Sequence, residues 1–157
     1  MITRSLLDRI KDRLNKGKAI VLVGPRQVGK TTLINALLKD ISYLFLFGDD
    51  SVVMDTLSGA NTETLKSIIR EYKYVFIDEV QRIPNIGLKL KIIVDHIKDV
   101  QVIVSGSSVL DIHNLTQEPL TGRKFEFQMF PVSWTEFENN VGYMKAQQQL
   151  EIRLLYG

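Results

Sequence analysis

The stretch Gly24–Thr31, GPRQVGKT, matches the pattern G-x-x-x-x-G-K-[ST] at every fixed position. Its two glycines allow a loop to close around phosphate groups, so that backbone N–H groups and the N-terminus of the next helix point at the negative charge. Lys30 adds a positive charge for the β- and γ-phosphates, and the Thr31 hydroxyl is a magnesium ligand. The stretch therefore predicts binding of a nucleoside triphosphate. The predicted binding residues are Gly24, Pro25, Arg26, Gln27, Val28, Gly29, Lys30, Thr31 and Thr32.

The residues on either side of this loop support the same prediction. Residues 19–23, AIVLV, are apolar and largely β-branched, which is typical of a buried strand. Residues 32–39 carry four apolar side chains at helical spacing. A strand, a glycine-rich loop and a helix in this order are the context that the motif requires, whereas a Gly-Pro turn before an ordinary helix is the alternative.

Composition limits the other classes of function. The chain has 157 residues, of which 45% are hydrophobic and 24% charged, as in one soluble globular domain. The net charge of +2 forms no basic stripe that would itself indicate nucleic-acid binding. The absence of cysteine excludes disulfides and a cysteine nucleophile, and with two histidines a zinc site is not expected. A nucleotide loop without a signal peptide or a long apolar span predicts a cytoplasmic protein that makes no membrane contact.

A second motif, Tyr74–Glu79 (YVFIDE), consists of apolar residues that end in two acids. At the C-terminal end of a buried strand, adjacent carboxylates lie beside the phosphate loop, where they can take part in the reaction of the bound nucleotide. Asp78 is predicted to hold magnesium through its water shell, and Glu79 to take the proton of an attacking water. The alternative is a strand that merely ends in solvated acids.

Two further strands end in polar residues. Residues 43–47 are followed by Asp49 and Asp50, which either face the nucleotide or cap the next helix. Residues 100–104 are followed by the run 105–108, SGSS, in which a hydroxyl either senses the γ-phosphate or caps the next helix.

The second half of the chain contributes one candidate cation. Residues 113–122 are polar, include a proline and are predicted to form a mobile loop. Arg123 follows, and it either cancels charge on the transferring phosphate, in its own subunit or across an interface, or forms a surface ion pair. Residues 124–129 alternate between apolar and polar side chains, which predicts an edge strand, whereas the strands at 19–23, 74–78 and 100–104 read as central.

Both ends of the chain read as helical. Residues 2–14 have an amphipathic pattern, and residues 2–4 are candidates for contact with the nucleotide base. Ser133–Glu136 is a capping box, and residues from Met144 onward are helical and unusually apolar. We therefore expect an ATPase-type domain at 1–140, and at 141–157 the start of a helical segment that leads to a missing C-terminal domain.

The segments GPRQVGKTTL, VFIDEVQRIPN, VSGSSVLDI and LTGRKFEFQMFPVSWTEF together resemble the AAA-like ATPase domain of a widespread prokaryotic family of two-part proteins. In that family a C-terminal domain similar to restriction nucleases follows, although no nuclease motif is present in these residues. The resemblance implies an α/β fold, a three-layer α/β/α sandwich with a five-stranded parallel sheet in the order 5-1-4-3-2. It also implies an extra strand at 43–47 and a glutamate base at Glu79.

The resemblance supports Lys30, Thr31, Asp78, Glu79 and Arg123, and Ser107 rather than Ser105 as the sensor. Together with the motifs it predicts magnesium-dependent hydrolysis of ATP to ADP and phosphate, which drives a conformational change in an attached domain or partner. The predicted catalytic residues are Glu79, Lys30, Arg123 and Ser107, and the predicted metal ligands are Thr31 and Asp78.

The alternative is a nucleotide-gated module that binds a protein or nucleic acid and hydrolyses ATP negligibly on its own; a homo-oligomer fits either reading. A GTPase is disfavoured because the sequence contains no N-K-x-D motif. A small-molecule kinase is disfavoured because adjacent acids at 78 and 79 suit the activation of water.

Overall fold

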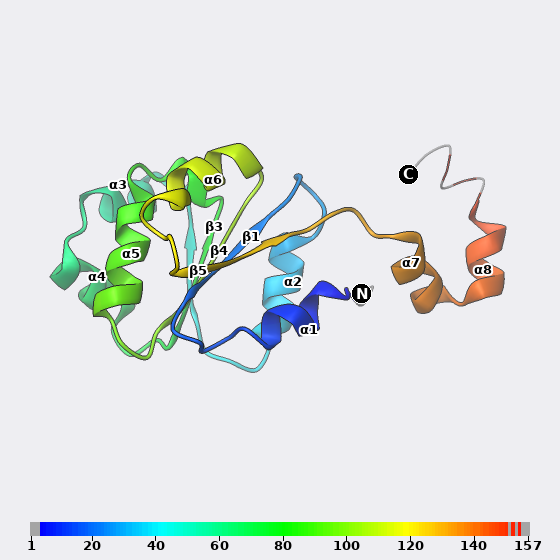
Figure 1. Ribbon diagram of the computed structural model, residues 1–157, viewed down its shortest axis with the longest axis horizontal. Helices are drawn as coiled ribbons and strands as arrows, with labels where there is room; N and C mark the ends of the chain where they lie inside the picture. The colour runs from blue at the N-terminus through cyan, green and yellow to red at the C-terminus, as the bar shows by residue number, and fades with distance from the viewer. Residues whose placement is uncertain (1–3, 151, 153, 155–157) are drawn as a thin grey trace.

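Five parallel strands form the centre of the computed structural model, which describes residues 4–150, 152 and 154 (Figure 1). The strands are β1 (Ala19–Val23), β2 (Leu44–Phe47), β3 (Tyr74–Asp78), β4 (Gln101–Gly106) and β5 (Lys124–Gln128). Their order in the sheet is β2-β3-β4-β1-β5, and every neighbouring pair is parallel. This confirms the predicted order 5-1-4-3-2, read from the opposite edge.

Helices cover both faces of the sheet. The helices in the described part of the chain are α1 (Leu6–Lys11), α2 (Lys30–Leu37), α3 (Ser51–Gly59), α4 (Thr62–Ile69), the 3-10 helix η1 (Val80–Arg82), α5 (Ile86–His96), α6 (Val109–Gln117), α7 (Trp134–Val141) and α8 (Tyr143–Gln148). Helices α3 to α6 lie on one face and α1 and α2 on the other (Figure 1). The predicted three-layer sandwich is confirmed.

Alternation along the strands divides the core between these two faces. Val21 and Val23 of β1 pack with the α3 to α6 side, whereas Ile20 and Leu22 pack with α1 and α2. All residues of β1 and β4 are buried, but β2 and β5 at the edges are partly exposed. The predicted division into central and edge strands is therefore correct.

The predicted mobile loop at residues 113–122 is wrong for its first half. Helix α6 continues to Gln117 and is capped by Ser108, whose hydroxyl accepts from Asp111 N–H. Ile112, Thr116 and Leu120 are fully buried at a spacing of four residues. The composition of this segment is polar, but these three side chains suffice to hold it on the core.

Beyond β5 the chain leaves the sandwich and forms α7 and α8, which lie side by side and apart from the sheet (Figure 1). The predicted capping box begins α7: Ser133 Oγ accepts from Glu136 N–H, and the Glu136 carboxylate accepts from Ser133 N–H. No helix in the described part of the chain is long and apolar enough to cross a membrane.

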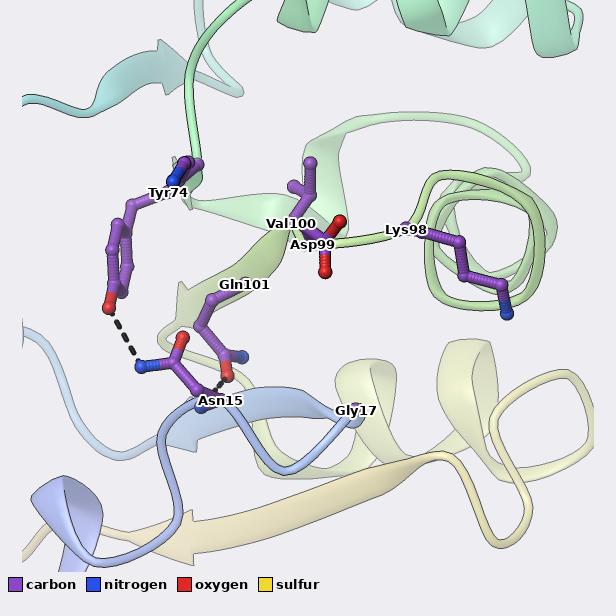
Figure 2. A pocket seen from close by; sticks show the side chains of 8 residues that line it. Asn15, Gly17, Tyr74, Lys98, Asp99, Val100 and Gln101 are labelled. Carbon is purple, nitrogen blue, oxygen red and sulfur yellow. Dashed lines mark hydrogen bonds between the residues drawn. The ribbon is translucent and has the colours of Figure 1, made fainter.

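A hollow of about 500 Å³ lies at the amino ends of β3 and β4 (Figure 2). The backbone N–H of Asn15 donates to Gln101 Oε1 at 2.7 Å, and Asn15 Nδ2 donates to Tyr74 Oη at 2.9 Å. Gln101 Nε2 in turn donates to the Lys18 carbonyl at 2.9 Å. These polar groups satisfy one another, so they anchor the connection between α1 and β1 to the sheet.

Candidate nucleotide-binding site

The loop between β1 and α2 has the backbone geometry that its sequence predicts. Gly29 lies at φ 94°, in the left-handed region that favours glycine. At Gly24, a Cβ would overlap the carbonyl oxygen of Met129, so only glycine allows the loop to leave β1 this close to the segment after β5. Helix α2 begins at Lys30 itself, which turns its first N–H groups toward the loop.

A pocket of about 540 Å³ lies at the carboxyl ends of the strands, in the size range of small-molecule sites. It is lined by Arg26, Gln27, Gly29, Lys30, Thr31, Thr32, Phe47, Asp49, Asp78 and Glu79. The loop motif and the acid motif, which are separate in sequence, are thus brought together. Of the predicted binding residues, Gly24, Pro25 and Val28 are not part of the lining.

Lys30 is buried, with 6% of its surface exposed. Its ammonium donates to the carbonyl oxygens of Gly24 and Pro25, both at 2.8 Å. Burial lowers the pKa of Lys30 below its usual 10.5, and the carboxylates of Glu79 and Asp78 only partly oppose this. An ammonium has three donors, so Lys30 retains one for a phosphate oxygen.

Asp78 is held from three sides at the end of β3. Thr31 Oγ1 donates to its Oδ2 at 2.6 Å. Its Oδ1 accepts from the hydroxyl of the buried Ser105 and, at 3.0 Å, from Glu79 N–H. A hydroxyl and a carboxylate in direct contact are the hard oxygen ligands that magnesium prefers, so this pair fits the predicted metal position.

Glu79 follows in the left-handed backbone region, at φ 50° and ψ 44°, which residues other than glycine rarely adopt. Its Oε2 accepts hydrogen bonds from Gln81 Nε2 at 2.6 Å and from Ser107 Oγ at 3.1 Å. Ser107 therefore contacts the predicted base, and Ser108 is the residue that caps α6. Strained backbone of this kind is concentrated at functional sites.

The structure resolves the two alternatives for the acids after β2. Asp50 caps α3 by accepting from Val52 N–H at 2.8 Å. Asp49 lines the pocket and forms an ion pair with Arg82 at 3.1 Å. Each acid thus takes one of the two predicted positions.

Arg123 is not brought to this pocket within the chain. Its carbonyl accepts from Ala19 N–H at the start of β1, whereas the phosphate loop follows the end of β1. Five strand residues separate the two ends, which is about 16 Å. Arg123 Nε instead pairs with Asp95 at 2.7 Å, and this hydrogen bond holds the pKa of Asp95 below its usual value. The predicted role in its own subunit is thus not supported by the geometry.

Of the amino-terminal candidates for contact with the base, Arg4 lies among the described residues. Residues 2 and 3 lie outside the described residues. Arg4 Nη1 donates to the carbonyl of Val28 in the phosphate loop at 3.2 Å, and its Nε contacts Glu136. Arg4 therefore supports the loop from behind. No local pattern predicts the contacts of Arg4 with Val28, of Gln81 with Ser107 and of Ser105 with Asp78, because each joins residues that are distant along the chain.

Comparison with known proteins gives a family. Residues 16–138 match the family model described as AAA domain. Two uncharacterized proteins, from Mycobacterium tuberculosis and Mycobacterium bovis, are each 28% identical over 121 residues, which is 76% of this chain and 26% of theirs. The chain thus spans about a quarter of the length of these relatives.

A solved structure, the Walker-type ATPase PABY2304 of Pyrococcus abyssi, is similar in fold. The TM-score is 0.64 at 15% sequence identity, over 96% of this chain and 63% of that one. The parallel sheet with helices on both faces agrees with this likeness in fold. The family match covers most of the chain, and the protein therefore belongs to the AAA domain family.

Proposed function

We propose that this chain binds ATP with magnesium in the 540 Å³ pocket and hydrolyses it to ADP and phosphate. The observation that carries the proposal is the 2.6 Å hydrogen bond between Thr31 and Asp78. It joins the phosphate loop to the acid motif, and Lys30 and Glu79 line the same pocket. Membership of the AAA domain family supports nucleotide binding, and the absence of an N-K-x-D motif favours ATP over GTP.

Hydrolysis requires a base, a stabilising charge and an aligned water. In the proposed reaction the water oxygen bonds to the γ-phosphorus, and the bond from that phosphorus to the bridging oxygen breaks. Glu79 accepts the proton of the water, and ADP leaves with the electrons of the broken bond. Lys30 and the backbone N–H groups at the start of α2 oppose the negative charge of the phosphates.

Thr31 and Asp78 would hold the magnesium ion, Thr31 directly and Asp78 through the water shell of the ion. The ion would neutralise part of the charge on the β- and γ-phosphates. Ser105 keeps Asp78 oriented toward Thr31 through its hydrogen bond to the other carboxylate oxygen. We propose Ser107 as a sensor that acts through Glu79, since the hydroxyl contacts that carboxylate.

A second candidate is a nucleotide-gated interaction module, and the position of Arg123 favours it. With Arg123 paired to Asp95 at the far end of the sheet, the described chain brings Lys30 and Arg26 to the pocket but not the predicted catalytic arginine. Turnover would then await an arginine from a second subunit or partner. Arg4 contacts both Val28 and Glu136, so a conformational change in the phosphate loop can be transmitted to α7 and from there to an attached domain.

The first test is binding of ATP and GTP, with magnesium, to the wild-type chain, to Lys30→Ala and to Lys39→Ala. Lys39 is exposed just after the end of α2 and serves as the matched control. Losing the charged contacts of Lys30 should weaken ATP binding by at least about 100-fold, while Lys39→Ala should bind normally. Tight ATP binding by Lys30→Ala would contradict the proposed site.

The second test is phosphate release at several protein concentrations, with Glu79→Gln as the comparison. We expect Glu79→Gln to bind ATP as the wild type does and to release no phosphate, because the amide cannot take a proton from water. Undiminished hydrolysis by this variant would remove Glu79 from its role. Binding without release at every concentration of wild-type protein would favour the gated module.

The proposal extends to the domain organisation, the partners and the location of the protein. Because the chain spans about a quarter of its mycobacterial relatives, we propose that residues 1–140 form the ATPase domain and that the segment from 141 leads to a further domain. That domain, a second copy of the chain, another protein or a nucleic acid would receive the conformational change. We place this activity in the cytoplasm, where ATP is available.

A further inference from the structure

Three side chains at the tips of β3 and β4 form a closed hydrogen-bonded ring. Gln81 Nε2 donates to Glu79 Oε2 at 2.6 Å and to Ser107 Oγ at 3.1 Å. Ser107 Oγ donates to the same Glu79 oxygen at 3.1 Å. A carboxylate oxygen has two lone pairs, so these two donors fill the accepting capacity of Oε2. The other oxygen of Glu79, Oε1, is left for a different donor.

The amide of Gln81 is fixed in one orientation. With both N–H groups of Nε2 directed at Glu79 and Ser107, Oε1 of Gln81 is buried without a hydrogen-bond partner among the described residues. A buried unpaired carbonyl costs stability, yet the opposite orientation would place this oxygen against the carboxylate of Glu79. On its other side the amide is pressed against Gly106, where a Cβ would overlap Oε1. The ring therefore holds the Glu79 side chain between two strand ends.

We propose that Gln81 is a positioning residue that directs the Glu79 carboxylate, so that Oε1 meets the attacking water. This inference rests on the proposed function of the site. Glu79 has several rotatable bonds and a strained backbone, so without Gln81 its carboxylate would sample many directions. A base that is misplaced by about 1 Å loses on the order of 100-fold in rate. Gln81 is not among the residues that line the pocket, so its loss should spare ATP binding.

The test compares turnover and ATP affinity in the wild type and in Gln81→Met, which keeps the length of the side chain but donates no hydrogen bond. We expect kcat to fall about 10- to 100-fold with an unchanged Kd for ATP. If the wild-type protein binds ATP without hydrolysing it, the proposed function itself is contradicted. If the wild type hydrolyses ATP and Gln81→Met does so at the same rate or faster, the positioning role alone is overturned. A loss of ATP affinity in proportion to the loss of rate would overturn it too.

Two further variants separate positioning from a general structural effect. Gln81→Glu places a second carboxyl group beside Glu79, and two adjacent carboxyls share a proton. A proton shared in this way weakens Glu79 as a base, so turnover by this variant should fall below that of the wild type while ATP affinity is retained. Turnover by Gln81→Glu equal to that of the wild type would overturn the role.

Gly106→Ala approaches the same amide from the other side. A Cβ at Gly106 would overlap both Oε1 of Gln81 and Cδ1 of Ile112, so the methyl group should displace Gln81 and lower kcat. In a background of Gln81→Ala its effect should be smaller, because only the contact with Ile112 remains. Additive losses in the double variant would overturn the inference. Circular dichroism and the urea midpoint of each variant confirm that it is folded.

Discussion

Arg4 and Glu136, 132 residues apart in sequence, form an ion pair in which Arg4 Nε lies 3.3 Å from both carboxylate oxygens. Both side chains are largely buried, at 11% and 13% exposure. Arg4 also donates to the carbonyls of Val28 and Phe130, and the backbone and hydroxyl of Ser5 both donate to Glu136. The start of the chain thus joins the phosphate loop to the first turn of α7.

The first prediction concerns the energetic coupling of this pair. Arg4→Ala leaves the Glu136 carboxylate without its charged partner, and we expect a loss of about 2 kcal/mol in the free energy of unfolding, measured with urea. Glu136→Ala should cost a similar amount, and the double variant should cost less than the sum of the two. Arg9→Ala, an exposed arginine on α1, is the matched control and should change stability by less than about 0.5 kcal/mol. Strict additivity would contradict the coupling.

The second prediction is a dependence of stability on pH that arises from Glu136. Burial opposes its ionisation, but the N–H groups of Ser133 and Ser5 and the charge of Arg4 outweigh this and hold the pKa of Glu136 below its usual 4.5. The ionised form therefore stabilises the folded state above pH 4.5, and this contribution is lost as the pH falls through the lower folded pKa.

Wild type and Glu136→Gln measured across this range test the prediction. Their difference in free energy of unfolding should be constant near neutral pH and should shrink in acid. The exposed Glu118→Gln, which removes the same charge elsewhere, is the control. A difference that grows as the pH falls would have the wrong sign.

The third prediction follows from the buried ammonium of Lys30. Its pKa in the free protein lies below 10.5 because of burial, and phosphate oxygens raise it when ATP binds. ATP affinity should therefore fall as the pH rises through the pKa of the free protein, at an alkaline pH below 10.5. Isothermal titration at several pH values measures this, and Lys30→Ala should bind weakly with no such dependence. If the ATP affinity of the wild type stays constant up to that pH, the protonation of Lys30 is not linked to ATP binding.

Much of the fold was predictable because its signals are local. A run of five apolar residues, a glycine-rich loop and a helical pattern fix residues 19–37, and the acids after β3 mark the edge where ligands bind. The order of the strands came from a family resemblance, since pairing between distant strands leaves no periodic signal. The contacts of Gln81 with Ser107 and of Arg4 with Glu136 were not predicted for that reason. The ring of Gln81 closes on Ser107, 26 residues away, and Arg4 contacts Glu136 at the other end of the chain.

The sequence also contained signals against a loop at 113–117 and against a role of Arg123 at the site of its own subunit. Residues 113–117 are helical because Ile112, Thr116 and Leu120 recur at a spacing of four, but the polar residues around them concealed the pattern. Arg123 directly precedes a strand that is parallel to β1. A residue before a parallel strand lies at the amino edge of the sheet, and the phosphate loop lies at the opposite edge.

That geometry gives the last prediction. Arg123 lies about a strand length from the pocket and is paired to Asp95, so Arg123→Ala should leave the ATP Kd unchanged and leave turnover by dilute, monomeric protein within about twofold of wild type. Phosphate release across a dilution series measures this, and light scattering checks the oligomeric state of the protein at each dilution. If the variant loses activity only at concentrations where the wild type self-associates, Arg123 acts on the phosphate of a neighbouring subunit, and mixing Arg123→Ala with Glu79→Gln should then restore turnover. A loss of activity that is equal at every dilution would contradict the placement, because a side chain at the amino edge has no path to the γ-phosphate of its own chain.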